Sequence, residues 1–105
     1  MANISLSVLD QSPIRSGGTA ADAINETIRL AQLTETLGFS RFWVSEHHAS
    51  EGLAGCSPEV LLARLGAETN TIRIGSGGVM LPHYSPYKVA ENFKLLETMY
   101  PGRID

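Results

Sequence analysis

The sequence predicts an α/β protein in which parallel strands alternate with helices. Segments with strand periodicity begin near residues 4, 41 and 72, and a loop and a helical segment follow each of them. The starts are about 30–37 residues apart, which is the length of a βα unit. Polar or very small residues follow each strand, where parallel α/β folds place their functional groups.

The first unit begins with ISLSVL at residues 4–9, an alternation typical of a strand. A helix is predicted over residues 20–37, because Thr19 and Asp22 can form a capping box. Gly38 is suited to end this helix in the left-handed conformation. The apolar stripe of the helix is expected to contain Ile24, Ile28, Leu30, Ala31, Leu33 and Leu37.

The second unit begins with a short, aromatic and β-branched segment, RFWVS at residues 41–45, which predicts a buried strand. A polar loop follows. Ser57 is expected to cap a helix whose first residue is Pro58, where a missing N–H costs nothing. The apolar side of this helix is expected to contain Val60, Leu61, Ala63, Leu65 and Ala67.

The third unit begins with a predicted strand at residues 71–75 and an irregular loop. Ser85 and Pro86 repeat the Ser-Pro start of the second helix. Residues 101–102 end the third helix, and residues 103–105 are expected to approach a fourth strand. One face of the third helix is expected to contain Val89, Phe93, Leu96 and Tyr100.

Periodicity leaves two architectures open. A closed barrel of eight βα units needs about 250 residues, and the 105 residues of this chain supply three units. The alternative is a small open sheet with helices on both faces.

Composition restricts the partners. The chain is 43% hydrophobic and 18% charged, which is ordinary for a globular protein. The net charge is −3 and basic residues form no stripe, so neither nucleic acid nor a membrane surface is an expected partner. The single Cys56 excludes an internal disulfide, and no signal peptide or apolar span is recognisable. We therefore expect a cytoplasmic protein.

The cluster Glu46-His47-His48 follows the second strand and is the most informative candidate site. Histidine is the side chain whose ordinary pKa lies nearest neutrality, which suits proton transfer. Because consecutive strand residues face opposite sides, His47 and His48 are expected to do different jobs. Loop hydrogen bonding is the alternative. A metal site of Glu46, His48 and His83 is a weaker hypothesis, because no His-x-His or His-x-x-x-His pair occurs, and we expect no metal.

Gly77-Gly78 follows the third strand, after Ser76. A residue pair without side chains lets the backbone approach a ligand closely, and a plain turn is the alternative interpretation. The segment matches neither GxGxxG nor GxxxxGK[ST], so a phosphate cradle is not predicted here.

Several motifs together resemble one family. They are an LDQSP turn after the first strand, Glu-His-His after the second and Gly-x-Gly-Gly-Val-Met-Leu-Pro in the third unit, followed by Ser-Pro and Pro-Gly-Arg-Ile-Asp. The chain resembles bacterial-luciferase-like flavin-dependent monooxygenases over essentially its whole length. The resemblance implies a TIM (β/α)₈ barrel, of which residues 1–105 form a single partial domain: the truncated N-terminal part, with helices on the outer side of parallel strands.

The resemblance also implies an activity, in which reduced flavin and dioxygen oxidise a small organic substrate such as an aldehyde. FMN, reduced by a partner flavin reductase, is the implied cofactor, and deazaflavin is the alternative. Catalytic roles fall on His47 and Glu46, with His47 transferring protons or stabilising the oxygenated flavin. Ser76, Gly77, Gly78 and His47 are the implied cofactor contacts, and the Gly77–Gly78 peptide is expected to be cis.

A second class of function stays open. The resemblance implies that most phosphate-binding residues lie beyond the third strand, including an arginine after the fourth. The chain is then a catalytically inactive fragment or an oligomerising module. Open sheet edges and uncovered helix faces predict self-association into a homo-oligomer. A metal-dependent barrel hydrolase is a third, weaker class.

Overall fold

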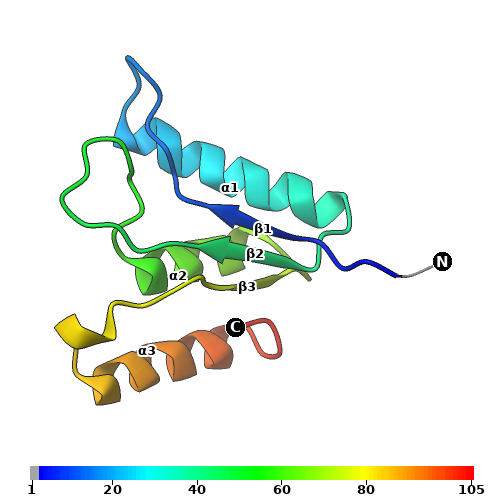
Figure 1. Ribbon diagram of the computed structural model, residues 1–105. Helices are drawn as coiled ribbons and strands as arrows, with labels where there is room; N and C mark the ends of the chain where they lie inside the picture. Colours follow the sequence, from blue (N-terminus) through cyan, green and yellow to red (C-terminus); the bar gives the residue numbers. More distant parts are fainter. Residues whose placement is uncertain (1–2) are drawn as a thin grey trace.

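The computed structural model describes residues 3–105, so that Met1 and Ala2 lie outside the described part of the chain. Three strand–helix pairs follow one another, as the sequence predicts (Figure 1). None of the helices in the described part combines the length and the apolar character needed to cross a membrane. The elements are β1 (Ser7–Asp10), α1 (Ala20–Thr36), β2 (Arg41–Val44), α2 (Pro58–Glu68), β3 (Arg73–Ser76), the short 3₁₀ helix η1 (Leu81–His83) and α3 (Pro86–Met99).

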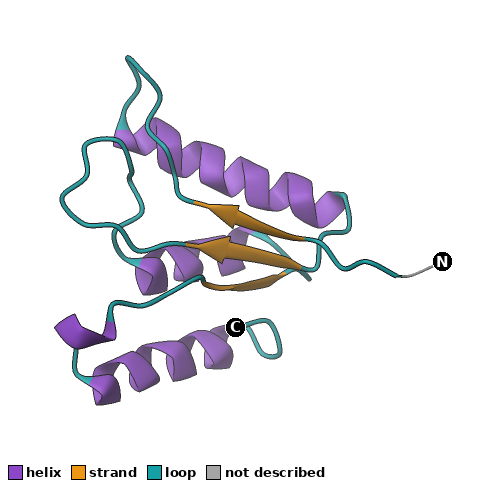
Figure 2. Cartoon of the chain, viewed as in Figure 1, coloured by secondary structure: helices purple, strands orange, loops and turns teal. Residues whose placement is uncertain are grey.

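The three strands form one parallel sheet in the order β1-β2-β3, with the helices around it (Figure 2). Because side chains alternate along a strand, this register gives the sheet two distinct faces. Phe42 and Ile74 are fully buried on the helix side. On the other face Trp43 lies beside Gly75, where a Cβ would come within 2.7 Å of the Trp43 ring. Gly75 therefore makes room for Trp43.

The core lies between the sheet and the helices. Phe42, Val44 and Ile74 supply the sheet side, and α2 supplies most of the helix side. Gly66 of α2 is needed for close packing, because a Cβ there would overlap the Tyr100 ring. The buried cluster consists of Ile28, Ala31, Phe42, Val44, Leu61, Leu62, Leu65, Ile72, Ile74 and Leu96.

Some of the predicted helix starts and ends are confirmed in full, and others only in part. The capping box of Thr19 and Asp22 is present, and Gly38 has a φ of +84°, as predicted. Ser57 occupies the predicted N-cap position of α2, but its side chain makes no capping bond, because its hydroxyl donates to the Glu59 carboxylate at 2.8 Å. Ser85 likewise makes no side-chain cap. In both Ser-Pro pairs the proline lies in the first helical turn as predicted, whereas the serine side chain makes no capping bond.

The predicted apolar faces need correction. Leu33 of α1 and Leu37, which follows the end of α1, are 53% and 64% exposed, whereas Thr27 and Thr34 are buried. These threonines can be buried because the Thr34 hydroxyl bonds the Ala31 carbonyl and the Thr27 hydroxyl bonds Asp10. Ile4 and Leu6 of the first predicted strand are also exposed, as are Val60 and Ala67 of the second predicted helix, and β1 starts three residues later than predicted.

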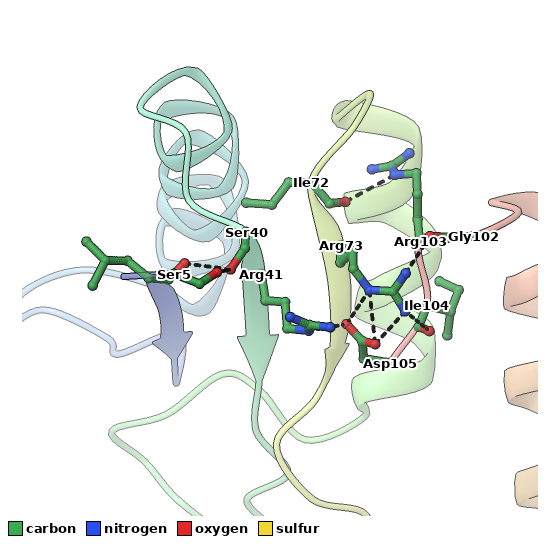
Figure 3. Close-up of polar contacts among 10 residues, drawn as sticks. Ser5, Ser40, Arg41, Ile72, Arg73, Gly102, Arg103, Ile104 and Asp105 are labelled. Atoms are coloured by element: carbon green, nitrogen blue, oxygen red, sulfur yellow. Dashed lines mark hydrogen bonds and ion pairs between the residues drawn. The ribbon is translucent and has the colours of Figure 1, made fainter. Parts of the chain in front are cut away.

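The expected approach to a fourth strand is confirmed. Ile104 makes a parallel bridge with Ile74, so that the chain after α3 returns alongside β3. Asp105 then receives hydrogen bonds from both Arg73 and Arg41, the latter at 2.8 Å (Figure 3). Bonds from Arg73 lower the pKa of Asp105, and Arg41 adds to this against the opposing effect of burial. This charge cluster ties β2, β3 and the returning segment together.

A carboxylate on α1 holds the turn between α2 and β3. One oxygen of Glu35 accepts the backbone N–H groups of Asn70, Thr71 and Ile72 at 2.8, 2.7 and 3.0 Å. Burial alone would raise the pKa of Glu35, but the bonds from these three N–H groups outweigh it and lower the pKa. The ionised side chain is therefore the form that stabilises the turn.

Glu35→Gln tests this anchor. A carboxyl group with a lowered pKa stabilises the fold above its ordinary pKa of 4.5, and the stabilisation is lost as the pH falls through the lowered value. We expect the variant to melt at a lower temperature than the wild type at neutral pH. Its melting temperature should also fall less on acidification, as followed by circular dichroism.

Glu51→Gln, in an exposed loop position, is the matched control and should melt as the wild type does. Equal pH dependence of melting in Glu35→Gln and the wild type would contradict the role of Glu35.

Candidate functional site

The loops that follow the three strands meet at one end of the sheet (Figure 1). The ladder between β2 and β3 continues beyond β3, because the Gly77 N–H donates to the Val44 carbonyl at 2.7 Å. Gly77 therefore lies beside the end of β2, where the polar cluster Glu46-His47-His48 begins. The parallel register brings these two segments together, although 30 or so positions separate them in sequence.

A pocket of about 260 Å³ forms where these segments meet. It brings together His47, Glu46, Gly77 and Gly78, four of the five residues that the sequence proposed as a site. Ser76 is not among its lining residues. The lining consists of Leu9, Ser45, Glu46, His47, Gly77, Gly78, Val79 and Met80.

His47 is oriented by its own loop. The Ser45 hydroxyl lies 3.0 Å from Nδ1 of the imidazole, and the His47 backbone N–H donates to the Gly55 carbonyl at 2.9 Å. The hydroxyl can donate to Nδ1 or accept from it, so it fixes the ring in either tautomer. Within residues 3–105 no hydrogen bond engages Nε2, which leaves this nitrogen free to exchange a proton.

Gly77 and Gly78 present bare backbone to the pocket. A Cβ on Gly78 would meet no heavy atom within 4 Å, whereas one on Gly77 would lie 3.3 Å from Leu9 and from the Val44 carbonyl. The expectation of a cis peptide is wrong: residues 3–105 contain no cis peptide bond. The Ser76 hydroxyl bonds both the carbonyl and the N–H of Gly78, so Ser76 shapes this turn from outside the pocket.

Glu46 and His48 lie in different surroundings from His47. The Glu46 side chain is only 2% exposed, and its two oxygens accept the Met80 N–H at 2.5 Å and the Tyr84 hydroxyl at 2.6 Å. Nε2 of His48 lies 3.6 Å from Glu46, and the His83 ring lies edge-on to His48. The two histidines thus have separate partners. Burial would raise the pKa of Glu46, but the bonds from Tyr84 and Met80 outweigh it and lower the pKa.

The metal hypothesis gains no support. In the described part of the chain, no three His, Cys, Asp or Glu side chains are grouped so that they could hold a metal ion. Glu46, the proposed anionic ligand, is instead bonded to Met80 and Tyr84.

Asp10, at the end of β1, points to the helix side. Its carboxylate accepts the Thr27 hydroxyl of α1 at 2.5 Å and the Ser12 N–H at 3.1 Å. Ser12 has a positive φ of 53° and is 1% exposed. The sequence predicts polar residues at the end of each strand, but it does not reveal this network, because nothing in it pairs Asp10 with Thr27.

The loops after β1 and β2 are also bonded to each other. Pro13 and Leu53 form an antiparallel bridge, the Ile14 N–H donates to the Gly52 carbonyl at 2.8 Å, and the Ala54 N–H donates to the Ser12 carbonyl at 2.9 Å. These bonds give the long β2–α2 loop, which carries His47, a fixed support.

Comparison with known proteins identifies the family. A family model described as luciferase-like monooxygenase matches residues 4–105. This chain therefore belongs to the luciferase-like monooxygenase family, and the resemblance based on its motifs is confirmed.

Curated relatives include two proteins of Bacillus subtilis strain 168. The uncharacterized protein YwcH is 63% identical over 102 residues, and N-acetyl-S-alkylcysteine monooxygenase is 59% identical over 102 residues. Both matches cover 97% of this chain, but they cover 31% and 30% of the two relatives. The chain thus spans somewhat less than a third of the length of the curated relatives it matches.

Solved structures show the same architecture. The structure of apo-MsnO8 is 51% identical with a TM-score of 0.95, and the match covers 98% of this chain and 31% of that chain. The oxygenating constituent of 3,6-diketocamphane monooxygenase from Pseudomonas putida, in complex with FMN, has a TM-score of 0.88 over 97% of this chain and 28% of its own. An F420-dependent secondary alcohol dehydrogenase has a TM-score of 0.70 over 95% of this chain and 29% of its own.

At 24% identity each, the last two show the fold alone. The three βα units match part of the luciferase-like TIM barrel, so the barrel is the correct choice over an open sheet.

Tyr84 provides a spectroscopic test of the Glu46 network. The hydrogen bond to Glu46, followed by burial and neighbouring carboxylates, raises the pKa of Tyr84 from 10.0 to about 12. The tyrosinate absorbance of Tyr84 is isolated by subtracting the titration curve of Tyr84→Phe from that of the wild type, and we expect this difference to rise near pH 12. In Glu46→Gln the Tyr84 absorbance should rise nearer pH 10. A wild-type difference titration at the ordinary tyrosine pKa would show that the bond is absent.

Proposed function

We propose that this chain forms one side of the flavin site of a flavin-dependent monooxygenase, in which reduced flavin and dioxygen oxidise a small organic substrate. The observation that carries this proposal is that His47 and the bare Gly77–Gly78 backbone line one pocket. Membership of the luciferase-like monooxygenase family supports the chemistry.

The residues present fit a flavin ring. An isoalloxazine is flat and largely apolar and carries polar atoms along one edge, so it needs a smooth wall and few polar groups. Gly78 offers such a wall because a Cβ there would have open space around it. Leu9, Val79 and Met80 add apolar surface, and His47 adds one polar group.

Each residue has a task in this proposal. Bound reduced flavin supplies the electrons with which dioxygen is cleaved, one oxygen atom entering the substrate and the other leaving as water. His47, held through Nδ1 by Ser45, gives or takes a proton at Nε2. Gly77 and Gly78 bind the ring by van der Waals contact, and Leu9 and Met80 exclude water from it.

Two names among the structural neighbours bear on the cofactor. One neighbour is a complex with FMN, and another is an enzyme that depends on F420, a deazaflavin. We propose reduced FMN supplied by a partner reductase, with deazaflavin as the alternative. The name of the 59% identical relative makes S-alkylated thiols candidate substrates, in addition to aldehydes. We further propose that the protein acts in the cytoplasm.

An oligomerising or catalytically inactive module is the second candidate. The observation in its favour is that large apolar side chains are exposed, among them Leu9 at 59% and Leu37 at 64%. Covering such surface favours self-association. Flavin binding separates the two candidates, because an inactive module has no need of a flavin pocket.

Gly78→Leu tests the flavin wall. The substituted side chain meets no atom of the protein within 4 Å at Cβ, so the fold should persist while the pocket is filled. We expect FMN fluorescence to be quenched by the wild-type chain, and we expect about tenfold or weaker affinity in the variant, comparable to losing one good contact.

Gly52→Leu is the matched control, because a Cβ at Gly52 also meets open space but lies outside the pocket. It should bind FMN as the wild type does. Absence of quenching at high micromolar wild-type protein would favour the inactive module, and equal binding by Gly78→Leu would refute the wall.

A further inference from the structure

Glu46 sits at the junction of the two segments that line the pocket, yet its carboxylate is turned away from solvent. Its side chain is 2% exposed and receives hydrogen bonds from two points of one segment, Met80 and Tyr84. These two residues flank η1, so Glu46 holds both ends of this short helix.

The turn before η1 explains why Met80 needs such a partner. The Leu81 N–H donates to the Val79 carbonyl at 2.8 Å, and Met80 between them has φ −76° and ψ 68°. These are the values of an inverse γ-turn. The turn uses the N–H of Leu81 and leaves the N–H of Met80 outside it. Oε2 of Glu46 accepts that N–H at 2.5 Å, which is a charge-assisted bond.

Packing contributes little to the position of this segment. No residue of η1 is buried, and Met80, Leu81 and Tyr84 are 38%, 52% and 36% exposed. Two pockets of about 260 Å³ each adjoin the segment, and Val79 lines both of them. Because much of the segment is exposed, the two hydrogen bonds to Glu46 are its main polar attachment to the loop that follows β2.

Glu46 itself rests on a rigid support. It lies two residues after β2, where the Gly77 N–H bonds Val44 and the His47 N–H bonds Gly55. The same stretch of backbone carries both side chains: the His47 imidazole is bonded to Ser45, and the Glu46 carboxylate is bonded to Met80 and Tyr84. Two adjacent residues thus supply the imidazole of the pocket and hold the other segment that lines it.

We propose that Glu46 is a positioning residue, which fixes the Gly77–Met80 wall opposite His47 and thereby sets the affinity of the pocket for the flavin ring. This inference rests on the proposed function and adds a role to it. Glu46 touches neither flavin nor substrate in this role; it acts through Met80 and Tyr84.

Three variants separate the bonds. Glu46→Ala removes both acceptors, Glu46→Gln retains one acceptor oxygen, and Tyr84→Phe removes the hydroxyl but leaves the Met80 bond. Glu51→Ala, in an exposed position of the same loop, is the matched control. Amide hydrogen exchange of Met80 and FMN affinity are measured on each, with thermal melting as the check on folding.

In Glu46→Ala we expect Met80 to lose its exchange protection while Phe42 and Ile74 keep theirs, and FMN to bind about tenfold more weakly or worse, as for a lost charged hydrogen bond. Glu46→Gln and Tyr84→Phe should fall between Glu46→Ala and the wild type, which is the rescue that a general loss of stability would not give. Glu51→Ala should match the wild type.

Unchanged Met80 exchange in Glu46→Ala would overturn the proposal, and so would lost protection with unchanged FMN affinity. A wild-type chain that shows Met80 protection but binds no FMN would overturn the proposed function, and with it the link from Glu46 to flavin affinity. Faster exchange of the Met80 amide in Glu46→Ala would in that case still show that Glu46 bonds Met80. Failure of the proposed function and failure of the role of Glu46 are therefore distinguishable.

Discussion

The hydrogen bond from the Gly77 N–H to the Val44 carbonyl, at 2.7 Å, is the interaction on which the candidate site depends. It carries the parallel register of β2 and β3 one residue beyond the end of β3. As a result the two loops leave the sheet side by side. His47 and the Gly77–Gly78 backbone then line the same pocket. Nothing in the sequence of either loop would by itself bring the two loops together.

Carboxylates recur as the anchors of this architecture. Glu35 holds the turn before β3, Asp10 holds the loop after β1 to α1, and Glu46 holds the segment around η1. In each case an acidic side chain accepts N–H or O–H groups from a segment distant in sequence. Loops that bury few apolar side chains depend on such charge-assisted bonds, which are about twice as strong as neutral ones. Asp105 serves the same purpose toward two arginines.

The repeating pattern and the rim of the fold could be predicted from the sequence, because periodicity and strand-end chemistry are local. The capping box at Thr19 and the left-handed Gly38 are local as well. The exposed Leu33 could not be predicted, because the rotation of α1 on the sheet depends on the tertiary position of Thr27.

The same limit applied to the site. The shared edge of Glu46-His47 and Gly77-Gly78 followed from parallel topology. The bonding partners of Glu46 could not be predicted in this way, because only the path of the β3–α3 loop brings Met80 and Tyr84 to it. A carboxylate beside two histidines is compatible with catalysis, metal binding or anchoring, and only its burial and its bonding partners favour anchoring.

The most direct test of a shared flavin pocket is nuclear Overhauser spectroscopy on the isotopically labelled chain with FMN. Contacts from the isoalloxazine protons to both the His47 ring and the Gly78 α-protons are the predicted result. Contacts confined to other residues, or contacts to only one of these two walls, would contradict it.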